Sequence, residues 1–287
     1  MTQKLRQLVA EELAQPVDPR VRAMAAAIAA RYGKAARAVL FYGSCLREQQ
    51  LDGLMLDFYL IVSSYGGAYG RKWLAAANRL VPPNVFHFAY DGLMAKYAVL
   101  SEADFHRLNG PETRNVSVWA RFAQPSRIAW AADDAAVVRA VDAVARAVPT
   151  LLGAALPSAP PSDDPLDLWR HAFALTYSAE LRAERKGRSG SVVDSDPERY
   201  RRFTAPGLAA AVPNRQSWAR RRVEGKLLSV LRLAKASATF AGGAEYIAWK
   251  INRHAGTDIV LKPWQRRFPL LAALSLLPRL LRSGAIR

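Results

Sequence analysis

The sequence predicts an α/β (α+β) protein in which a small mixed β-sheet in the first half of the chain is followed by a mostly helical second half. Short apolar runs that end in turn residues alternate with helical periodicity before about residue 150, and helical periodicity dominates after residue 165. Residues 157–165 between them are rich in Pro, Ser and Asp, as in a linker. We therefore expect one domain at residues 1–155, a helical domain at residues 163–261, and a basic amphipathic tail at residues 262–287.

The elements of the first half follow from local patterns. Residues 4–31 place apolar side chains at helical spacing, and Asp18-Pro19 is a helix-start signal, so two helices are expected there. Another helix, rich in Ala and Val, is expected at residues 135–147. Four short apolar runs bounded by turn residues are expected to be strands, at residues 38–42, 54–62, 85–90 and 94–100.

The second half shows helical periodicity in two long segments, residues 166–185 and 216–239. The stretch at residues 186–214 is polar, contains Gly, Ser and Pro, and has no clear assignment. Residues 257–261 are an ambiguous strand candidate. No internal repeat is visible.

Charge and composition restrict the partners and the compartment. The 287 residues include 41 Lys plus Arg and 24 Asp plus Glu, a net charge of +17, which predicts a polyanionic partner: nucleic acid, nucleotide phosphates or anionic lipid. One cysteine, Cys45, excludes a disulfide framework and a Cys-rich zinc site. No apolar run reaches the roughly 18 residues of a spanning helix, and residues 1–13 lack the apolar core of a secretory signal. We expect a cytoplasmic protein, free or bound to a surface.

The tail combines positive charge with apolar side chains. Residues 262–287 contain no acidic residue, and residues 269–281 are mostly Leu, Ala and Pro. This composition is typical of a segment that lies in a membrane interface with its arginines on the lipid headgroups. The alternative is a helix packed on the protein's own core. The basic residues of the tail are Lys262, Arg266, Arg267, Arg279, Arg282 and Arg287.

A glycine-serine turn and a later aspartate are the features that point to chemistry. Gly43-Ser44 follows the first expected strand, and Asp57 is the single charge in the second. This arrangement is similar to that of the polymerase-beta-like nucleotidyltransferases, where the glycine admits a triphosphate, the serine and nearby N–H groups hold its phosphates, and the carboxylate binds Mg²⁺. An ionised carboxylate in an apolar strand is costly unless it is paired or metal-bound. The alternative is an aspartate that caps a loop or pairs with an arginine.

One position departs from that pattern. The superfamily usually has a second carboxylate two residues after the first, and this chain has Tyr59 there. A second metal ligand would have to come from elsewhere. Glu180 is one candidate, and Asp91 and Asp52 are weaker ones.

Five segments, in order, extend the similarity. Together they resemble the mitochondrial-type phosphatidate cytidylyltransferases, the CDP-diacylglycerol synthases of the nucleotidyltransferase superfamily, and suggest a bacterial homologue. The resemblance covers about residues 40–185 and does not extend beyond about residue 210. The segments are Tyr42-Gly-Ser-Cys45, Met55-Leu-Asp-Phe58, Ala95-Lys-Tyr-Ala-Val-Leu-Ser101, Trp119-Ala-Arg-Phe-Ala-Gln-Pro125 and Leu175-Thr-Tyr-Ser-Ala-Glu-Leu-Arg182.

The resemblance implies a reaction. CTP and phosphatidic acid would give CDP-diacylglycerol and pyrophosphate with Mg²⁺ as cofactor, in a nucleotidyltransferase domain followed by a mostly helical one. It also implies peripheral attachment to an anionic membrane surface, on the inner face of the cell membrane. The sequence does not favour nucleic acid as a partner, and it leaves open both the choice between CTP and dCTP and the formation of a homodimer.

Roles for single residues follow from the same resemblance. Asp57 would be the metal ligand, and Tyr42, Gly43 and Ser44 would bind the nucleotide. Lys96 and Arg121 would act in catalysis by binding phosphate, for which lysine and arginine are suited. For Lys96 the alternative is a solvent-facing position, and for Arg121 it is a surface ion pair.

A second group is assigned to the lipid phosphate. Arg182 would bind it, and Glu180 lies two residues away on the same expected helix. Cys45 is interpreted as a small side chain that fills space.

Two other functions remain compatible with these residues. The first is a nucleotidyltransferase that acts on RNA or on a small hydroxylated acceptor. The apolar tail argues against RNA, since an RNA enzyme would interleave basic and exposed aromatic residues. The second is a non-catalytic binding protein on a nucleotidyltransferase scaffold, which Tyr59 suggests.

Overall fold

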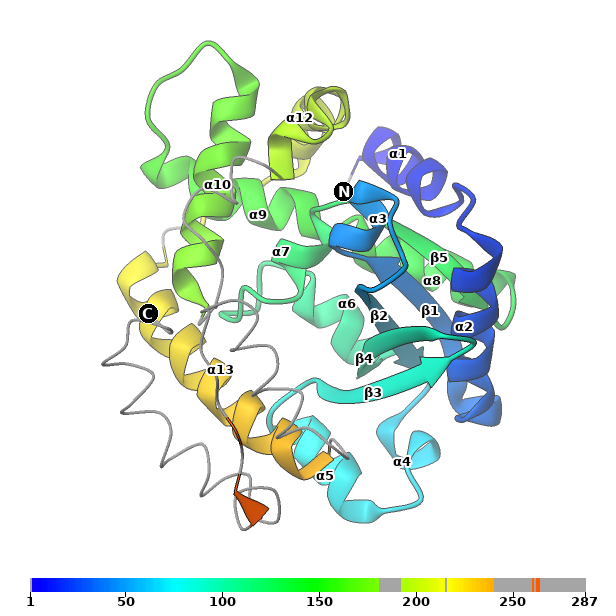
Figure 1. Ribbon diagram of the computed structural model, residues 1–287. Helices are drawn as coiled ribbons and strands as arrows, with labels where there is room; N and C mark the ends of the chain where they lie inside the picture. Colours follow the sequence, from blue (N-terminus) through cyan, green and yellow to red (C-terminus); the bar gives the residue numbers. More distant parts are fainter. Residues whose placement is uncertain (1, 181–191, 215, 240–259, 261, 264–287) are drawn as a thin grey trace.

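A five-stranded mixed sheet forms the centre of the computed structural model (Figure 1), which describes residues 2–180, 192–214, 216–239, 260 and 262–263. The strands lie in the order β3-β4-β2-β1-β5. Strand β1 is antiparallel to β2 and β5, β2 is parallel to β4, and β3 is antiparallel to β4. The bounds are Ala36–Tyr42 for β1, Met55–Val62 for β2, Asn84–Tyr90 for β3, Leu93–Ser101 for β4 and Ser126–Ala131 for β5. The α/β class and the mixed sheet are thus confirmed, and four strands lie where the sequence predicts them.

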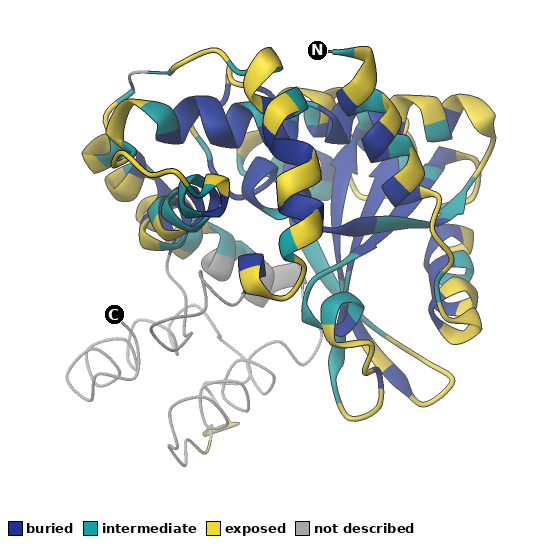
Figure 2. Ribbon diagram, turned by 90° about the horizontal axis from the view of Figure 1, so that it is seen from above, coloured by how far each residue is buried: buried dark blue, intermediate teal, exposed yellow. Residues whose placement is uncertain are grey.

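Alternating side chains give the sheet two buried faces. One face packs against helix α2 (Pro19–Ala30), and its side chains include Phe41, Phe58 and Tyr97. The other face carries Leu40 and Tyr59 and packs against several helices. Figure 2 shows the strands and the inner sides of the helices as buried, with exposed residues on the outer sides. Both faces of β2 are covered, which explains its nearly continuous apolar sequence.

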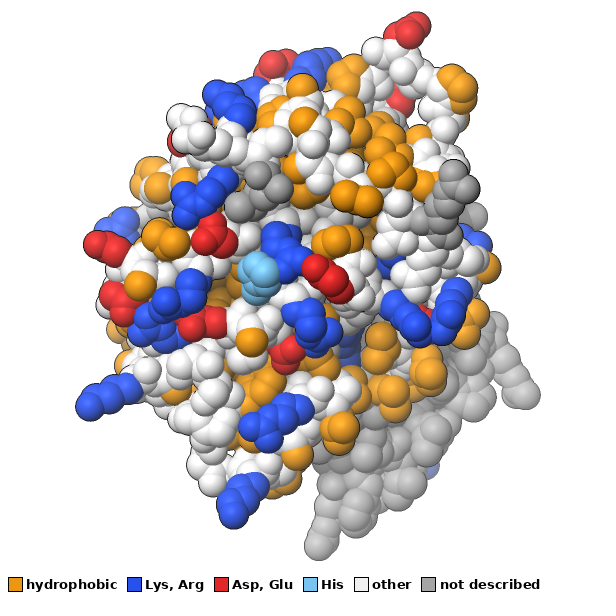
Figure 3. Space-filling view, turned by 180° about the vertical axis from the view of Figure 1, so that it is seen from behind, with side chains coloured by type: hydrophobic (Ala, Val, Ile, Leu, Met, Phe, Trp, Pro, Cys, Tyr) orange, Lys and Arg blue, Asp and Glu red, His pale blue; other side chains and the backbone are white. Residues whose placement is uncertain are grey.

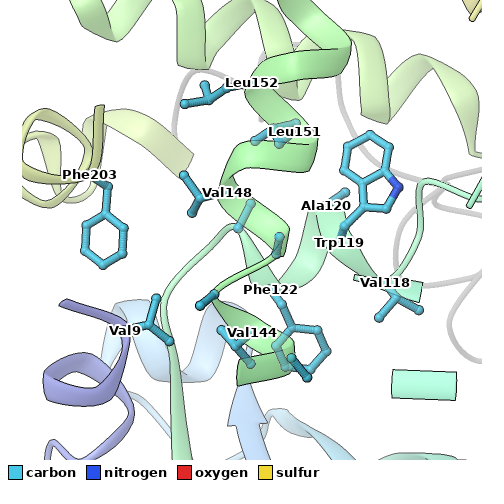
Figure 4. Packing of buried hydrophobic residues seen from close by; sticks show 14 of the residues in the cluster. Val9, Val118, Trp119, Ala120, Phe122, Val144, Val148, Leu151, Leu152 and Phe203 are labelled. Carbon is cyan, nitrogen blue, oxygen red and sulfur yellow. The ribbon is translucent and has the colours of Figure 1, made fainter. Parts of the chain in front are cut away.

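Helices from distant parts of the chain cover the second face. They contribute to one hydrophobic cluster, part of which is drawn in Figure 4, where Val9, Phe122, Val148 and Phe203 come from four different helices. The helices are α1 (Gln3–Leu13), α6 (Glu102–Leu108), α7 (Trp119–Phe122), α8 (Asp134–Val144), α9 (Ala147–Ala155), α10 (Pro165–Ala179) and α12 (Pro197–Ala210). Segments from both expected domains therefore share this cluster. The division into residues 1–155 and 163–261 stays a prediction.

Shorter elements complete the described fold. Helix α3 (Ser44–Glu48) follows β1, and α4 (Tyr65–Ala68) and α5 (Lys72–Leu80) follow β2. The long helix α13 (Trp218–Thr239) lies beside β3 and α10. Single 3₁₀ turns occur at Gly33–Ala35 and Leu156–Ser158.

A buried ion pair ties the second half of the chain to its start. Arg199 on α12 is 6% exposed and Glu12 on α1 is 7% exposed, and the Arg199 guanidinium donates to both carboxylate oxygens of Glu12. The guanidinium also donates to the Ala123 carbonyl at 2.9 Å. Such a pair is tolerated in a core because its hydrogen bonds compensate the loss of hydration.

The structure differs from the expected elements at several places. The helix expected at residues 135–147 is present as α8 but ends earlier, at Val144, and α9 begins at Ala147; Pro149, which has no N–H for a continuous helix, lies in the first turn of α9. Strand β5 was not expected, and α12 lies in the stretch that had no assignment, where Asp196-Pro197 starts it. Helix α10 ends at Ala179. The expected strand at residues 257–261 and the tail at residues 262–287 lie outside the described residues, apart from Val260, Lys262 and Pro263.

Charged side chains of both signs occupy the surface. Figure 3 shows Lys and Arg side chains with Asp and Glu side chains between them on the face seen from behind. Ion pairs on the surface include Arg37 with Asp133 at 2.8 Å and Arg139 with Glu102 at 2.7 Å. Within the described residues, no helix is both long enough and apolar enough to span a bilayer.

Candidate active site

The turn after β1 places a glycine directly against Asp57. Gly43 has φ 94° and ψ −162°, a conformation that only glycine adopts readily, and it precedes α3. The register of β1 and β2 pairs Tyr42 with Asp57. A Cβ atom on Gly43 would lie 2.8 Å from Asp57 Oδ2. The absence of a side chain at residue 43 is therefore what allows the Asp57 carboxylate to lie at the turn.

Lys96 is the charged neighbour of this carboxylate. The parallel register of β2 and β4 pairs Asp57 with Lys96, and Lys96 Nζ lies 3.0 Å from Asp57 Oδ1. The Asp57 side chain is 18% exposed and the Lys96 side chain is 31% exposed, so the pair lies at the edge of the buried region. Among the described residues, no hydrogen bond is aligned on the buried Oδ1 atom. The contact with Lys96 is thus mainly electrostatic, and the carboxylate keeps capacity to accept a further bond.

Four side chains form a row across this face of the sheet. Strand register places Tyr42, Asp57, Lys96 and His87 side by side on β1, β2, β4 and β3. The position of His87 follows from the two-residue turn Asp91-Gly92, which pairs Tyr90 with Leu93 and so fixes the register of the whole hairpin. Burial lowers the pKa of His87 below its ordinary value, which favours a neutral ring at pH 7.

Tyr59 is a core residue. It is 2% exposed, and its ring lies 5.4 Å from that of Tyr42 and 5.1 Å from that of Phe122. Burial raises the pKa of the Tyr59 hydroxyl, which keeps it neutral. The position that carries a second carboxylate in the superfamily is therefore occupied here by an aromatic packing residue, and half-buried Tyr42 packs against the same ring.

Cys45 has no features of a reactive thiol. Its side chain is 2% exposed and its Sγ lies 3.5 Å from the Met55 carbonyl oxygen. Burial, and then the charge of Asp57, raise the pKa of the thiol to about 11. A thiol that stays protonated at neutral pH is a poor nucleophile, which agrees with the interpretation of Cys45 as a space-filling residue.

Arg121 and Glu180 lie together. Arg121 on α7 is 3.2 Å from Glu180 Oε1, and Glu180, at the C-terminus of α10, is 9% exposed. Burial is the largest influence on Arg121 and acts to lower its pKa, but Glu180, through its charge and its hydrogen bond, together with Tyr59 and Tyr42 leaves the pKa well above the ordinary value. Glu180 is thus the counter-ion of Arg121. Arg182, expected to bind the lipid phosphate, lies outside the described residues.

Two cations of α13, which no pattern in the sequence points to, also approach this face. Arg232 donates to the Pro82 carbonyl at 2.8 Å and to the Ser117 hydroxyl at 2.9 Å. Lys235 donates to the Pro83 carbonyl at 2.8 Å and to the Val81 carbonyl. These contacts join residues more than 100 positions apart, so a local pattern cannot reveal them.

The lowered pKa of Lys235 should make the free energy of unfolding depend on pH. Burial, and then the charge of Arg232, lower the pKa of Lys235 from 10.5 to about 7. Between these values the unfolded chain binds a proton that the folded chain has lost, so stability rises with pH, by at most about 1.4 kcal/mol per pH unit. We expect wild type to gain stability relative to Lys235→Met from pH 6.5 to pH 9, measured by urea unfolding. Lys226→Met, at an exposed position of α13, is the control, and parallel curves for wild type and Lys235→Met would contradict the expectation.

The residues of this site could bind a magnesium ion only if phosphate oxygens of the substrate supply some of its ligands. Among the described residues, no group of three or more His, Cys, Asp or Glu could hold a metal ion. Mg²⁺ in nucleotide sites commonly takes one or two carboxylates, with substrate phosphates and water completing its coordination. Asp57, whose carboxylate lies against Gly43 and whose buried Oδ1 accepts no aligned hydrogen bond among the described residues, meets that minimum.

Comparison with known proteins adds no further information. A scan against protein-family models finds no matching family, and a search of curated proteins finds no match. The assignment of a class therefore depends on the residues and their geometry: a mixed sheet in which an aspartate faces a Gly-Ser turn, with a lysine on the adjacent strand.

Proposed function

We propose that the protein is a phosphatidate cytidylyltransferase, which converts CTP and phosphatidic acid to CDP-diacylglycerol and pyrophosphate. The observation that carries the proposal is the contact of the Asp57 carboxylate with the side-chain-free Gly43, beside Ser44 and paired with Lys96. A nucleotidyltransferase needs these elements together: a turn that admits a triphosphate, a carboxylate for Mg²⁺ and a cation for phosphate charge.

The residues of the chain have separate roles in the proposed reaction. Gly43 and Ser44 bind the β- and γ-phosphates, which leaves the α-phosphate near Asp57. Asp57 is the protein ligand for Mg²⁺, which when bound would neutralise charge on the α-phosphate and the leaving pyrophosphate. Lys96 orients the Asp57 carboxylate and adds positive charge beside it.

The chemistry requires no strong general base. An oxygen of the acceptor's phosphate monoester attacks the α-phosphorus of CTP, and the bond from that phosphorus to the bridging oxygen of pyrophosphate breaks. The bond's electron pair leaves with pyrophosphate. Because the attacking phosphate is already anionic at neutral pH, catalysis consists of positioning and charge stabilisation. The neutral His87 and the protonated Cys45 are consistent with this requirement.

The lipid acceptor is supported by the five segments that resemble the phosphatidate cytidylyltransferases. The composition of residues 262–287, basic and apolar without an acidic residue, agrees with a protein that works at the inner face of the cell membrane as a peripheral protein. Phosphatidic acid stays in the bilayer, so the enzyme must reach its phosphate from the surface.

A turnover assay tests the function. The full chain, CTP and Mg²⁺ are mixed with vesicles of phosphatidylcholine that contain or lack phosphatidic acid, and pyrophosphate and CDP-diacylglycerol are measured. We expect release of pyrophosphate that requires both phosphatidic acid and Mg²⁺. Pyrophosphate release at the same rate with and without phosphatidic acid would favour RNA or a small hydroxylated molecule as the acceptor. Absence of metal-dependent CTP binding would favour a non-catalytic binding protein.

A further inference from the structure

Two guanidinium groups are anchored on one residue beside the candidate active site. Ser117 accepts a hydrogen bond from Arg121 at its carbonyl oxygen and one from Arg232 at its hydroxyl oxygen. Arg121 comes from α7 and Arg232 from α13, more than 100 residues later. Ser117 therefore holds two cations of separate helices close to each other.

Within the part of the chain that the structure describes, the positive charge of this pair exceeds the negative charge of Glu180, the carboxylate that contacts it. Glu180 forms an ion pair with Arg121, and its charge also acts on Arg232. Burial is the main cause that lowers the pKa of Arg232, and the charge of Arg121 lowers it further. Among the described residues, the carboxylate of Glu180 thus faces two half-buried guanidinium groups, an arrangement that a second anion would stabilise.

Arg232 has a donor that is not used. Its Nε donates to the Pro82 carbonyl and its Nη1 to Ser117, but its buried Nη2 has no hydrogen-bond partner among the described residues. A buried donor without a partner is costly and points to a ligand. Arginine is suited to phosphate, since its planar group offers parallel N–H donors to two oxygens.

The pair lies on the same face of the sheet as Asp57. Tyr59 is two residues after Asp57 on β2, and its ring contacts that of Phe122, the neighbour of Arg121. The charges of Asp57, Arg121 and Arg232 all act on the Tyr59 hydroxyl. An anion at the two arginines would consequently lie next to the place where the α-phosphate is expected.

We propose that Arg121 and Arg232 form the binding site for the phosphate monoester of the acceptor, and that Glu180 occupies the arginines as their counter-ion when no acceptor is bound. The role in turnover rests on the proposed function, but the binding of a phosphate monoester does not. The assignment gives α13 a direct part in substrate recognition.

The test combines binding and kinetics on the full chain. Binding of inorganic phosphate, glycerol 3-phosphate and monomeric dihexanoyl phosphatidic acid is measured by calorimetry, and CTP with Mg²⁺ is measured separately. We expect Arg232→Met to weaken binding of the phosphatidic acid, and to raise its KM in turnover, by roughly tenfold to a hundredfold, with CTP affinity changed less than about twofold. Lys226→Met removes the same charge from an exposed position of α13 and should change neither.

Two further variants separate recognition from a structural effect. Arg232→Lys keeps the positive charge, so it should bind phosphatidic acid more tightly than Arg232→Met does and less tightly than wild type. If Arg232→Met does not fold, Arg232→Lys takes its place in the comparison with wild type. Glu180→Gln removes the competing carboxylate and should tighten phosphate binding, the opposite sign from loss of an arginine. Equal loss of CTP and acceptor binding in both Arg232 variants, or weaker phosphate binding in Glu180→Gln, would overturn the assignment.

The three probes show whether the site recognises phosphate alone or a lipid phosphate. Together with turnover, they also separate failure of the Arg121–Arg232 site from failure of the proposed function. Binding of all three probes would support a site that recognises the phosphate alone, and binding of phosphatidic acid alone would support one that also contacts the lipid. If wild type binds these probes through Arg232 but does not turn over phosphatidic acid, the proposed function fails and the site stands. If wild type turns over phosphatidic acid and Arg232→Met has an unchanged KM, the site fails and the function stands.

Discussion

Asp57→Asn is expected to reduce cytidylyl transfer by roughly a thousandfold or more, because the amide keeps the shape of the side chain but removes the charge that would bind Mg²⁺. The side chain lies at the Gly43 turn and pairs with Lys96, and no second carboxylate two residues later can replace it. The fold should persist, because Asn fits the same space. Turnover with CTP, Mg²⁺ and phosphatidic acid vesicles gives the rate, and circular dichroism gives the fold.

Asp142→Asn is a matched control. It removes the same charge from α8, where Asp142 pairs with Arg6 at 2.6 Å and has a side chain that is 37% exposed. Its turnover should equal that of wild type. An Asp57→Asn enzyme that works within about threefold of wild type would exclude Asp57 as the metal ligand.

Gly43→Ala is expected to reduce both turnover and stability. The new Cβ would lie 2.8 Å from Asp57 Oδ2, so the carboxylate or the turn must shift, and the backbone conformation adds about 1–3 kcal/mol of strain. Displacement of a reacting group by about 1 Å can reduce a rate a hundredfold. We therefore expect turnover to fall by about a hundredfold and the free energy of unfolding to fall by the strain.

Gly92→Ala separates strain from displacement. Gly92 also has a positive φ, 73°, but a Cβ there would meet nothing within 4 Å. The Gly92→Ala variant should lose stability and keep its turnover in the fraction that is folded. If the loss of turnover relative to the loss of free energy of unfolding is the same in Gly43→Ala and Gly92→Ala, the contact of Gly43 with Asp57 does not contribute to catalysis.

Parts of the site could be predicted from the sequence because they are local. Gly43-Ser44 ends one apolar run and Asp57 interrupts the next, and two adjacent antiparallel strands bring these positions together. The placement of His87 opposite Lys96 could also have been predicted, since the two-residue turn Asp91-Gly92 fixes the pairing. Strand β5 escaped prediction because six residues of mixed polarity carry little periodic signal.

The sequence by itself determined the α/β class, most elements of the sheet and the approach of Asp57 to the glycine turn. These depend on the period of apolar residues and on turn residues, which act over a few positions. Only the tertiary structure decided that Glu180 pairs with Arg121 and that Arg232 reaches Ser117. These contacts arise because helices far apart in the chain pack on one sheet face, and packing of that kind depends on the shape of the whole core.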